Sequence, residues 1–526
     1  MTKKYKIKRD HKMCRPAKEQ QINEQPINER PAKEQPIKES SHKNQPTKEA
    51  SLKEPSNNET LKEEWNSKED DRIYTLKEEK PAKAVVKMGV PLIAGMFIMV
   101  LYNLTDTFFI GLLRDDYQLA AVNLAYPVMM VMIAISNITG SGAGSLIARS
   151  MGEDEMEKAE QTLTSAFVLT AISSLTVSII GIVFLSPIVR ALGAKSNTDE
   201  FTQQYIFILL IGAVCVMGNY IFGQLLRSEG SVRISIVGMV AGTIANIALD
   251  PLFIFVFGLE IRGAAVATVI GNGIGMAASA LFYVRGKTLL RPSVRFIRPK
   301  AEIIKEIFWV GVPASLETLL TSAAYIVLNN LAVSYGELTV AAMGISQKIL
   351  SLGNYVYQGF ASGVQPLMGY NYGAGNFRRM LAVLRAGLSV VSGTELAIMA
   401  VCGIFAPQLI GLFTGSSEVI QTGSHVLRTI MWILPFVGAV SMSRMSFQAM
   451  GKPQFAFGIT LVRQLILYVP MLLVFDHIFG FDGMIWAQPV TEFIMMIVSV
   501  WLLVRNIKNE EQQFLLASAH ALPKDS

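Results

Sequence analysis

The sequence predicts an all-α membrane protein with 12 transmembrane helices in two six-helix lobes related by a parallel repeat. Three observations predict it: long apolar runs, a low charge density beyond residue 83, and motifs that recur in the second half. Of the 526 residues, 51% are hydrophobic, and the mean hydropathy is +0.38. Residues 1–83 hold 20 of the 47 Lys and Arg and 16 of the 41 Asp and Glu, so the rest is poor in charge. The net charge of +6 is therefore no nucleic-acid signal, and we expect no nucleic-acid partner.

Residues 1–83 are predicted to form a disordered cytosolic tail. The hexapeptide RPAKEQ at 15–20 returns at 30–35, and apolar residues are too few to offset the entropy of ordering. The first 80 residues also lack the apolar stretch of a cleavable signal peptide.

Twelve apolar runs of about 20 residues or more follow, each long enough to cross a bilayer. The predicted spans are 87–113, 119–149, 159–185, 201–226, 232–257, 263–285, 303–333, 339–370, 379–410, 419–450, 453–479 and 483–505. We therefore expect a first lobe over 84–286, an inter-lobe loop over 287–302, a second lobe over 303–507 and a C-terminal tail over 508–526.

Basic residues mark one side of the membrane. They concentrate in the even-to-odd connections, at Arg149, Arg227, Arg233, Arg285, Lys287, Arg291, Arg295, Arg298, Lys300, Lys305, Arg378, Arg379 and Lys452. The opposite loops carry few cations. By the positive-inside rule, we expect both termini and the inter-lobe loop to be cytosolic, in a multi-pass protein of the plasma or inner membrane.

The halves repeat in the same orientation. KMGVPLIAG at 87–95 matches WVGVPASLE at 309–317, and SGAGSLIARSMGE at 141–153 matches SGVQPLMGYNYGA at 362–374. RSEGSVR at 227–233 likewise matches QAMGKPQ at 448–454. Parallel repeats of spans are typical of two-lobed secondary transporters.

Two acids lie deep in the first lobe. Asp106, in YNLTDTFFIG, and Asp250, in NIALDP, are each about 18 residues into their spans, roughly 27 Å along a helix. A charge at that depth costs about 3 kcal/mol, so such residues are usually functional. Asn246 shares a helix face with Asp250, because the two are four residues apart.

Hydroxyl groups lie at the same height, from Thr268, Tyr205 and Tyr102. Together with the acids they predict an oxygen-rich site for a proton or a hard cation such as Na⁺. Structural readings stay open: Asp250 caps a helix broken at Pro251, Asn246 and Thr268 satisfy freed backbone groups, and Tyr205 anchors the interface.

The second lobe is less informative. Glu317 follows Pro313 near the cytosolic side, Arg444 is interpreted as belonging to the cytosolic end of its span, and Glu492 lies in the last span. No His/Cys spacing predicts a metal site and no Walker-type loop predicts ATP use, so we expect neither an enzyme nor a cofactor beyond the coupling ion.

The motifs GVP, YNLTDTFFIG, RSEG, ANIALDP and GVQPLMGYNYGA together resemble the multidrug and toxic compound extrusion (MATE) transporters over residues 84–505. The major facilitator superfamily, the nearest alternative, has a GxxxDRxGRR-like loop, whereas this chain reads ARSMGEDEMEKAE. The resemblance implies export of bulky, often cationic amphiphiles coupled to H⁺ or Na⁺. It also implies a bend of the first span at Pro91.

The same resemblance assigns roles. Asp106, Asn246, Asp250, Thr268 and Tyr102 match the family's coupling residues, and Tyr205 matches its second site tyrosine. Another branch places a coupling Glu where this chain has Thr321, one turn beyond Glu317, which puts an ion site in the second lobe in doubt.

The resulting hypothesis is a monomeric antiporter. Deprotonated Asp106 and Asp250, with Tyr102 and Tyr205, hold the lipophilic cation until H⁺ or Na⁺ enters and releases it. Two alternatives stay open: a lipid-linked precursor flippase, whose cavity would be cationic although basic residues here are expected to stay in cytosolic loops, and a non-transporting membrane scaffold.

Overall fold

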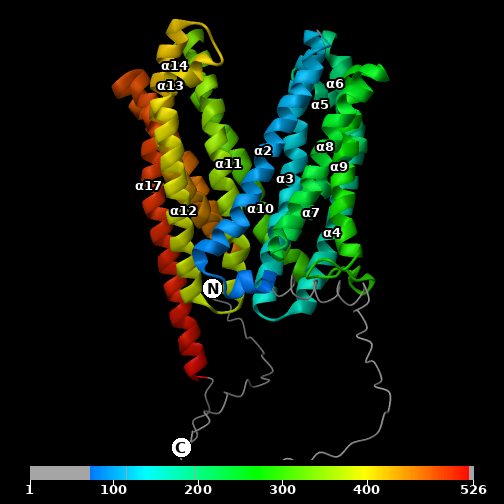
Figure 1. Ribbon diagram of the computed structural model, residues 1–526, viewed down its shortest axis with the longest axis vertical. Helices are drawn as coiled ribbons and strands as arrows, with labels where there is room; N and C mark the ends of the chain where they lie inside the picture. Colours follow the sequence, from blue (N-terminus) through cyan, green and yellow to red (C-terminus); the bar gives the residue numbers. More distant parts are fainter. Residues whose placement is uncertain (1–70, 114, 195, 521–526) are drawn as a thin grey trace, which may run out of the picture. The chain divides into compact units, whose positions relative to one another are not determined.

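The computed structural model describes residues 71–520 other than 114 and 195, together with most of their side chains. Within these residues the chain is helical and no strand is present (Figure 1). The predicted disorder of residues 1–70 lies outside the described residues.

The first half of the chain supplies six spans among the described residues, and Figure 1 shows how their helices are arranged. Its helices are α2 (Pro81–Gly111), α3 (Asp116–Gly152), α4 (Met156–Val183), the short α5 (Leu185–Ala191), α6 (Ser196–Ile211), α7 (Ala213–Ser228), α8 (Val232–Pro251), the π-helix η1 (Leu252–Val256) and α9 (Glu260–Val284). The pair α6 and α7 forms one span, bent by 56°.

The second half repeats this series. After a turn of 3-10 helix, η2, its elements are α10 (Ala301–Val333), α11 (Glu337–Gly373), α12 (Phe377–Ile404), α13 (Ala406–Gly411), α14 (Ser417–Ile430), η3 (Met431–Ile433), α15 (Leu434–Ala449), α16 (Pro453–Leu461), the π-helix η4 (Val462–Tyr468) and α17 (Val469–His520). Gly480, at φ 62° and ψ −141°, breaks α17 between the last two spans. Only glycine adopts this conformation without strain.

These helices confirm the predicted fold class. Among the described residues, eight helical segments are long and apolar enough to cross a membrane, and the bent pair adds a ninth. One of the eight, Pro453–Ala517, holds two spans because Gly480 divides it. Helices α10 and α11, of 33 and 37 residues, complete the series although polar residues lie along their length.

Several helices have a polar N-cap residue, which lies between two hydrophobic segments of the sequence. Asp115 caps α3 by accepting a hydrogen bond from the backbone N–H of Tyr117 at 2.9 Å. Asn376 caps α12 in the same way, accepting from the N–H of Arg379 at 3.1 Å. Such caps satisfy amide groups that no helical carbonyl can reach.

The two lobes meet through glycines near the ends of the helices that carry the basic loops, called the basic end below. A Cβ on Gly152 of α3 would lie 1.9 Å from the carbonyl oxygen of Tyr370 in α11. A Cβ on Gly373 of α11 would lie 2.1 Å from the carbonyl oxygen of Arg149 in α3. These two contacts are related by the sequence repeat, and neither helix could approach the other this closely with a larger residue.

Residues 71–79, called the bridging segment below, differ from the predicted tail. Residues 71–77 are helical, and α2 already begins at Pro81. Arg72 donates to the hydroxyl of Ser231 at 3.1 Å, on the first lobe. The carbonyl oxygen of Leu76 accepts from the amide of Asn371 at 3.0 Å and from Arg379 at 3.3 Å, on the second lobe. The expectation of disorder is therefore wrong for this segment, because contacts with both lobes order it.

Candidate functional site

Four of the predicted side chains meet where α2, α8 and α9 pack together. Asp106 comes from α2, Asn246 and Asp250 from α8, and Thr268 from α9. All four are buried, with exposed fractions of 9%, 2%, 0% and 0% in that order. Two carboxylates and an amide in an apolar surrounding are costly unless hydrogen bonds, protons or cations satisfy them.

Asn246 ties α8 to α9 at this point. With its amide oriented to satisfy both of its polar groups, Asn246 donates to Oδ2 of Asp250 at 3.2 Å and accepts from the backbone N–H of Thr268 at 3.1 Å. Gly271 lets the two helices come close, because a Cβ there would be 2.7 Å from the Cβ of Asn246. Asn246 therefore holds the Asp250 carboxylate in place.

Asp106 is the less satisfied of the two acids. Its Oδ1 is buried and has no hydrogen-bond partner among the residues the structure describes. Helix α2, which carries Asp106, packs against α8, which carries Asp250, so two buried carboxylates would repel each other there when both are ionised. A proton or a cation at this site would remove that repulsion.

The backbone changes type directly after Asp250. Helix α8 ends at Pro251, which cannot donate an amide hydrogen bond, and the chain continues as the π-helix η1. Departures of this kind often accompany functional sites in helices. Asp250 therefore lies beside a helix break and is also buried. The structural interpretation and the functional one are compatible.

The remaining predicted residues lie as follows. Tyr205, on α6, is buried in an apolar cluster that also contains Ile110 of α2 and Ile254 of η1, so it borders the site from one side. Pro91 lies inside α2, which continues from Pro81 to Gly111. The side chain of Tyr102 lies outside the described part of the structure.

Two asparagines extend the site and were missed from the sequence. Asn272 donates to the carbonyl oxygen of Thr268 at 2.8 Å, one turn earlier on α9. Asn219, on α7, donates to Oδ1 of Asn272 at 3.0 Å. The signal that could have revealed them was the i, i+4 spacing of Thr268 and Asn272 in an apolar run.

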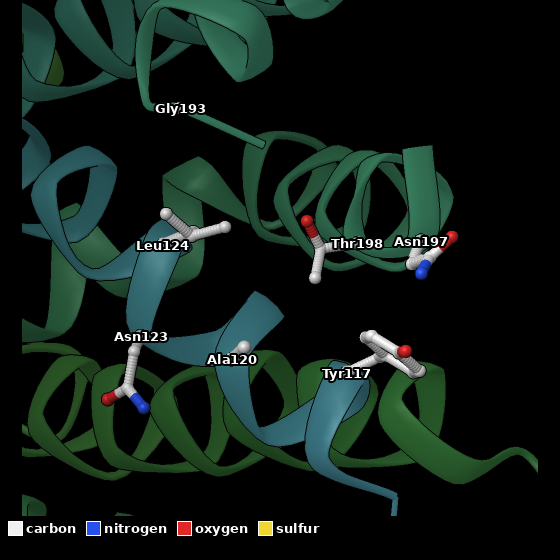
Figure 2. A pocket seen from close by; sticks show the side chains of 7 residues that line it. All are labelled: Tyr117, Ala120, Asn123, Leu124, Gly193, Asn197 and Thr198. Carbon is white, nitrogen blue, oxygen red and sulfur yellow. The ribbon is translucent and has the colours of Figure 1, made fainter. Parts of the chain in front are cut away.

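A cavity of about 530 Å³ opens between the first turns of α3 and α6, at the end of the first lobe opposite the basic end. Tyr117 and Asn123 line it from α3, and Asn197 and Thr198 from α6 (Figure 2). Because none of the four buried residues lines it, this cavity is separate from the site around Asp250.

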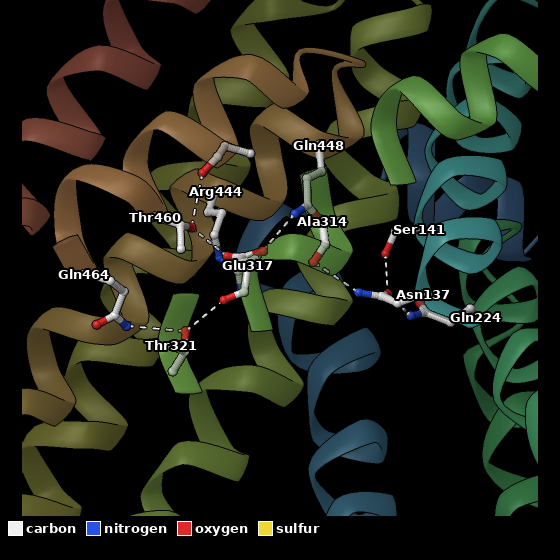
Figure 3. A network of polar contacts seen from close by, with 11 residues as sticks. Asn137, Ser141, Gln224, Ala314, Glu317, Thr321, Arg444, Gln448, Thr460 and Gln464 are labelled. Carbon is white, nitrogen blue, oxygen red and sulfur yellow. Dashed lines mark hydrogen bonds and ion pairs between the residues drawn. The ribbon is translucent and has the colours of Figure 1, made fainter. Parts of the chain in front are cut away.

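The second lobe contains a buried ion pair that joins α10 to α15 (Figure 3). Glu317 and Arg444 are in direct contact, with side chains only 13% and 19% exposed. The hydroxyl of Thr460 donates to Oε1 of Glu317 at 2.8 Å, and the amide of Gln448 donates to Oε2 at 3.4 Å. Arg444 lies in the last turns of α15, and the sequence did not predict that its guanidinium turns inward to pair with Glu317.

A second buried pair joins η4 to α17. Arg463 lies 3.4 Å from Glu492, and their side chains are 17% and 4% exposed. With Arg444, this places two cations inside the predicted spans, so the expectation that basic residues stay in loops was wrong. Each of the two has a carboxylate partner, which cancels its charge locally. Glu395 of α12, also missed from the sequence, is fully buried in the same lobe.

The polar groups also cross between lobes (Figure 3). Asn137 of α3 donates to the carbonyl oxygen of Ala314 in α10 at 3.5 Å and accepts from Ser141 at 2.7 Å. Ser315 donates to the carbonyl oxygen of Ala134 at 2.9 Å. Breaking these bonds is part of the free-energy cost of separating the lobes.

A family model described as MatE matches the chain twice, over residues 91–252 and 313–474. The two matches fall in the two repeats, one in each lobe. They include Asp106 and Asp250 in the first lobe and Glu317, Arg444 and Arg463 in the second.

Known proteins similar to the chain are transporters. The multidrug export protein MepA of Staphylococcus saprophyticus is 29% identical over 422 residues, which cover 80% of this chain and 92% of the relative. An outward-facing multidrug resistance MATE family transporter of the MOP superfamily is similar in structure, with a TM-score of 0.79, 30% identity and coverage of 83% and 98%. A MOP superfamily transporter from Pyrococcus furiosus, described as having a binding pocket of reverse polarity, gives a TM-score of 0.79, 30% identity and coverage of 84% and 98%.

Proposed function

The chain belongs to the MatE family of multidrug transporters, and on that premise we propose that it exports amphiphilic, often cationic compounds in exchange for H⁺ or Na⁺. The observation that carries the proposal is the buried pair of acids, Asp106 and Asp250, on two helices of one lobe. Each carboxylate can be neutralised by the coupling ion or by a cationic substrate. Once one of these cations is bound, the electrostatic attraction for the other is weak.

Competition for the two carboxylates supplies the coupling. When both are ionised, their repulsion and poor solvation favour entry of a lipophilic cation. When H⁺ or Na⁺ binds instead, the attraction for that substrate is lost and it leaves. Asn246 keeps Asp250 oriented in both states through its bond to the α9 backbone. Tyr205, and Tyr102 on α2, complete the proposed substrate site, and Pro91 is the proposed bend in α2.

Alternating access requires the lobes to separate at one end at a time. Here the basic end is held together by the two glycine contacts, by an ion pair of 2.8 Å between Arg149 and Glu306, and by the bond from Ser145 to the carbonyl oxygen of Gln448. We propose that this end faces the cytosol, as the positive-inside rule requires, and that both termini are cytosolic. On this orientation the protein is closed toward the cytosol.

The flippase alternative needs an uncompensated cationic interior. Arg444 and Arg463 do lie within the spans, but Glu317 and Glu492 neutralise them. Asp106, Asp250 and Glu395 are buried acids that take part in no ion pair among the described residues, whereas Lys348 and Arg385, cations of α11 and α12 that also take part in none, are exposed. This balance favours a cationic substrate over a phosphate-bearing lipid precursor.

The experiment is ethidium export by the full chain in inverted membrane vesicles. Asp106→Asn and Asp250→Asn should each insert normally and lose gradient-driven export. Glu418→Gln is the matched control, because it neutralises an exposed acid at the start of α14. Export at the wild-type rate by either Asp variant would overturn the proposed site.

A further inference from the structure

A second cavity, of about 250 Å³, lies at the basic end between α4 and the loop that leads into α10. Gln161 and Ser165 line it from α4, and Arg295, Arg298 and Lys300 line it from the loop. It lies at the other end of the first lobe from the cavity of Figure 2, and the proposed export mechanism does not use it.

The loop is fixed against α4 by its backbone. The N–H of Arg291 donates to Oε1 of Glu160 at 3.3 Å, and the N–H of Ser293 donates to the hydroxyl of Thr164 at 3.2 Å. Ser293 then caps the short 3-10 helix Val294–Phe296. The backbone of the loop is therefore fixed beside α4, and its exposed cations line the cavity from there.

The charge of this cavity favours an anion. Three cations face one acid, Glu157, which already accepts a hydrogen bond from Gln161 at 3.1 Å. Within the described residues, Arg295, Arg298 and Lys300 take part in no ion pair. Guanidinium groups bind phosphate oxygens in pairs, and clustered cations strengthen that binding.

The apolar residues of the loop indicate where such an anion comes from. Val294 and Ile297 are 83% and 50% exposed, and they alternate with Arg295 and Arg298. Exposed aliphatic side chains next to cations, at the end of membrane-spanning helices, are typical of a segment in the headgroup layer. A free phosphate ion would gain nothing from them, whereas a phospholipid would contact both kinds of residue.

We propose that this cavity binds the phosphate headgroup of an anionic phospholipid in the leaflet at the basic end. The bound lipid would join α4 to the loop that connects the two lobes. It would therefore stabilise the first lobe against the start of α10, where the second lobe begins. The lipid bound in this cavity would be a partner of the chain distinct from the compound that it exports.

The test places the full chain in nanodiscs of phosphatidylcholine alone or of phosphatidylcholine with phosphatidylglycerol. Melting temperature and lipid retention by native mass spectrometry are measured for wild type, for R295Q/R298Q/K300Q, and for the control R285Q/R378Q/K508Q, whose three cations are exposed elsewhere. We expect phosphatidylglycerol to raise the melting temperature of wild type and control but not of the site variant. Each removed cation should weaken retention about fivefold.

Two results would overturn the proposal. One is an equal phosphatidylglycerol effect in the site and control variants. The other is an equal rise in melting temperature on adding millimolar inorganic phosphate to phosphatidylcholine discs, which would indicate a site for free anions. If the triple variant fails to fold, Arg298→Gln alone carries the retention measurement, and unchanged retention in it counts against the site.

Discussion

Replacing Arg444 with methionine tests whether the ion pair of the second lobe is structural. The change keeps much of the side-chain volume but removes the cation that contacts Glu317. The hydrogen bonds left to the carboxylate would come from neutral groups, Thr460 at 2.8 Å and Gln448 at 3.4 Å. Because its side chain is 13% exposed, water cannot replace the lost charge.

The expected loss follows from the cost of an unpaired buried charge. Breaking a buried pair by removing one partner lowers the free energy of unfolding by about 3–5 kcal/mol. In the double variant E317Q/R444M neither charge of this pair remains, and the glutamine oxygen still accepts from Thr460. That variant should lose only about 1–2 kcal/mol, the difference between a charged and a neutral hydrogen bond.

The assay is equilibrium unfolding in mixed detergent micelles, for wild type, both single variants and the double variant. The double variant should be about 2–4 kcal/mol more stable than Arg444→Met, which would show favourable coupling between the two residues. The double variant should also retain ethidium export, because the coupling acids lie in the other lobe. If the double variant is as unstable as Arg444→Met, or stable without export, the structural role assigned to this pair is refuted.

Three further predictions concern the basic end. Gly152→Leu should push α3 away from Tyr370, whose carbonyl oxygen leaves no room for a Cβ. Cysteines placed at that interface should then be labelled faster, and unchanged labelling would contradict the closed arrangement. Burial raises the pKa of Glu229, outside the spans, to about 7, although Ser231 and the Leu290 amide oppose the shift. Since the folded pKa exceeds the unfolded value of about 4.5, stability should fall as the pH rises from 4.5 to 7, by roughly 3 kcal/mol at most, and Glu229→Gln should flatten the melting temperature against pH. Deleting residues 1–70 should preserve export, whereas extending the deletion through the bridging segment should lower the melting temperature. Loss of export on the shorter deletion would contradict the first expectation.

The fold was predictable because a membrane allows few solutions. Every apolar run of sufficient length must become a helix, since its backbone groups have no other partners in the bilayer. The bridging segment escaped prediction for the opposite reason. Residues 71–79 are polar and charged like the tail before them, and their order comes from Ser231, Asn371 and Arg379, which lie far along the chain.

The site was predictable as far as depth along a helix decides it. Counting residues from the span ends brought Asp106, Asp250, Asn246 and Thr268 to one level, because helices are regular rods. The inward turn of Arg444 was not predictable in this way. A long side chain near a span end can reach either the interface or the interior, and the partner that decides it, Glu317, lies on another helix.

The central claim is the exchange of a cation for substrate at the paired acids. Its most direct measurement is ethidium transport by the purified chain in proteoliposomes under an imposed pH gradient or an imposed Na⁺ gradient, applied separately. The account predicts that at least one gradient drives transport in wild type and that neither drives it in Asp250→Asn. Transport by wild type that ignores both gradients, or gradient-driven transport by Asp250→Asn, would contradict it.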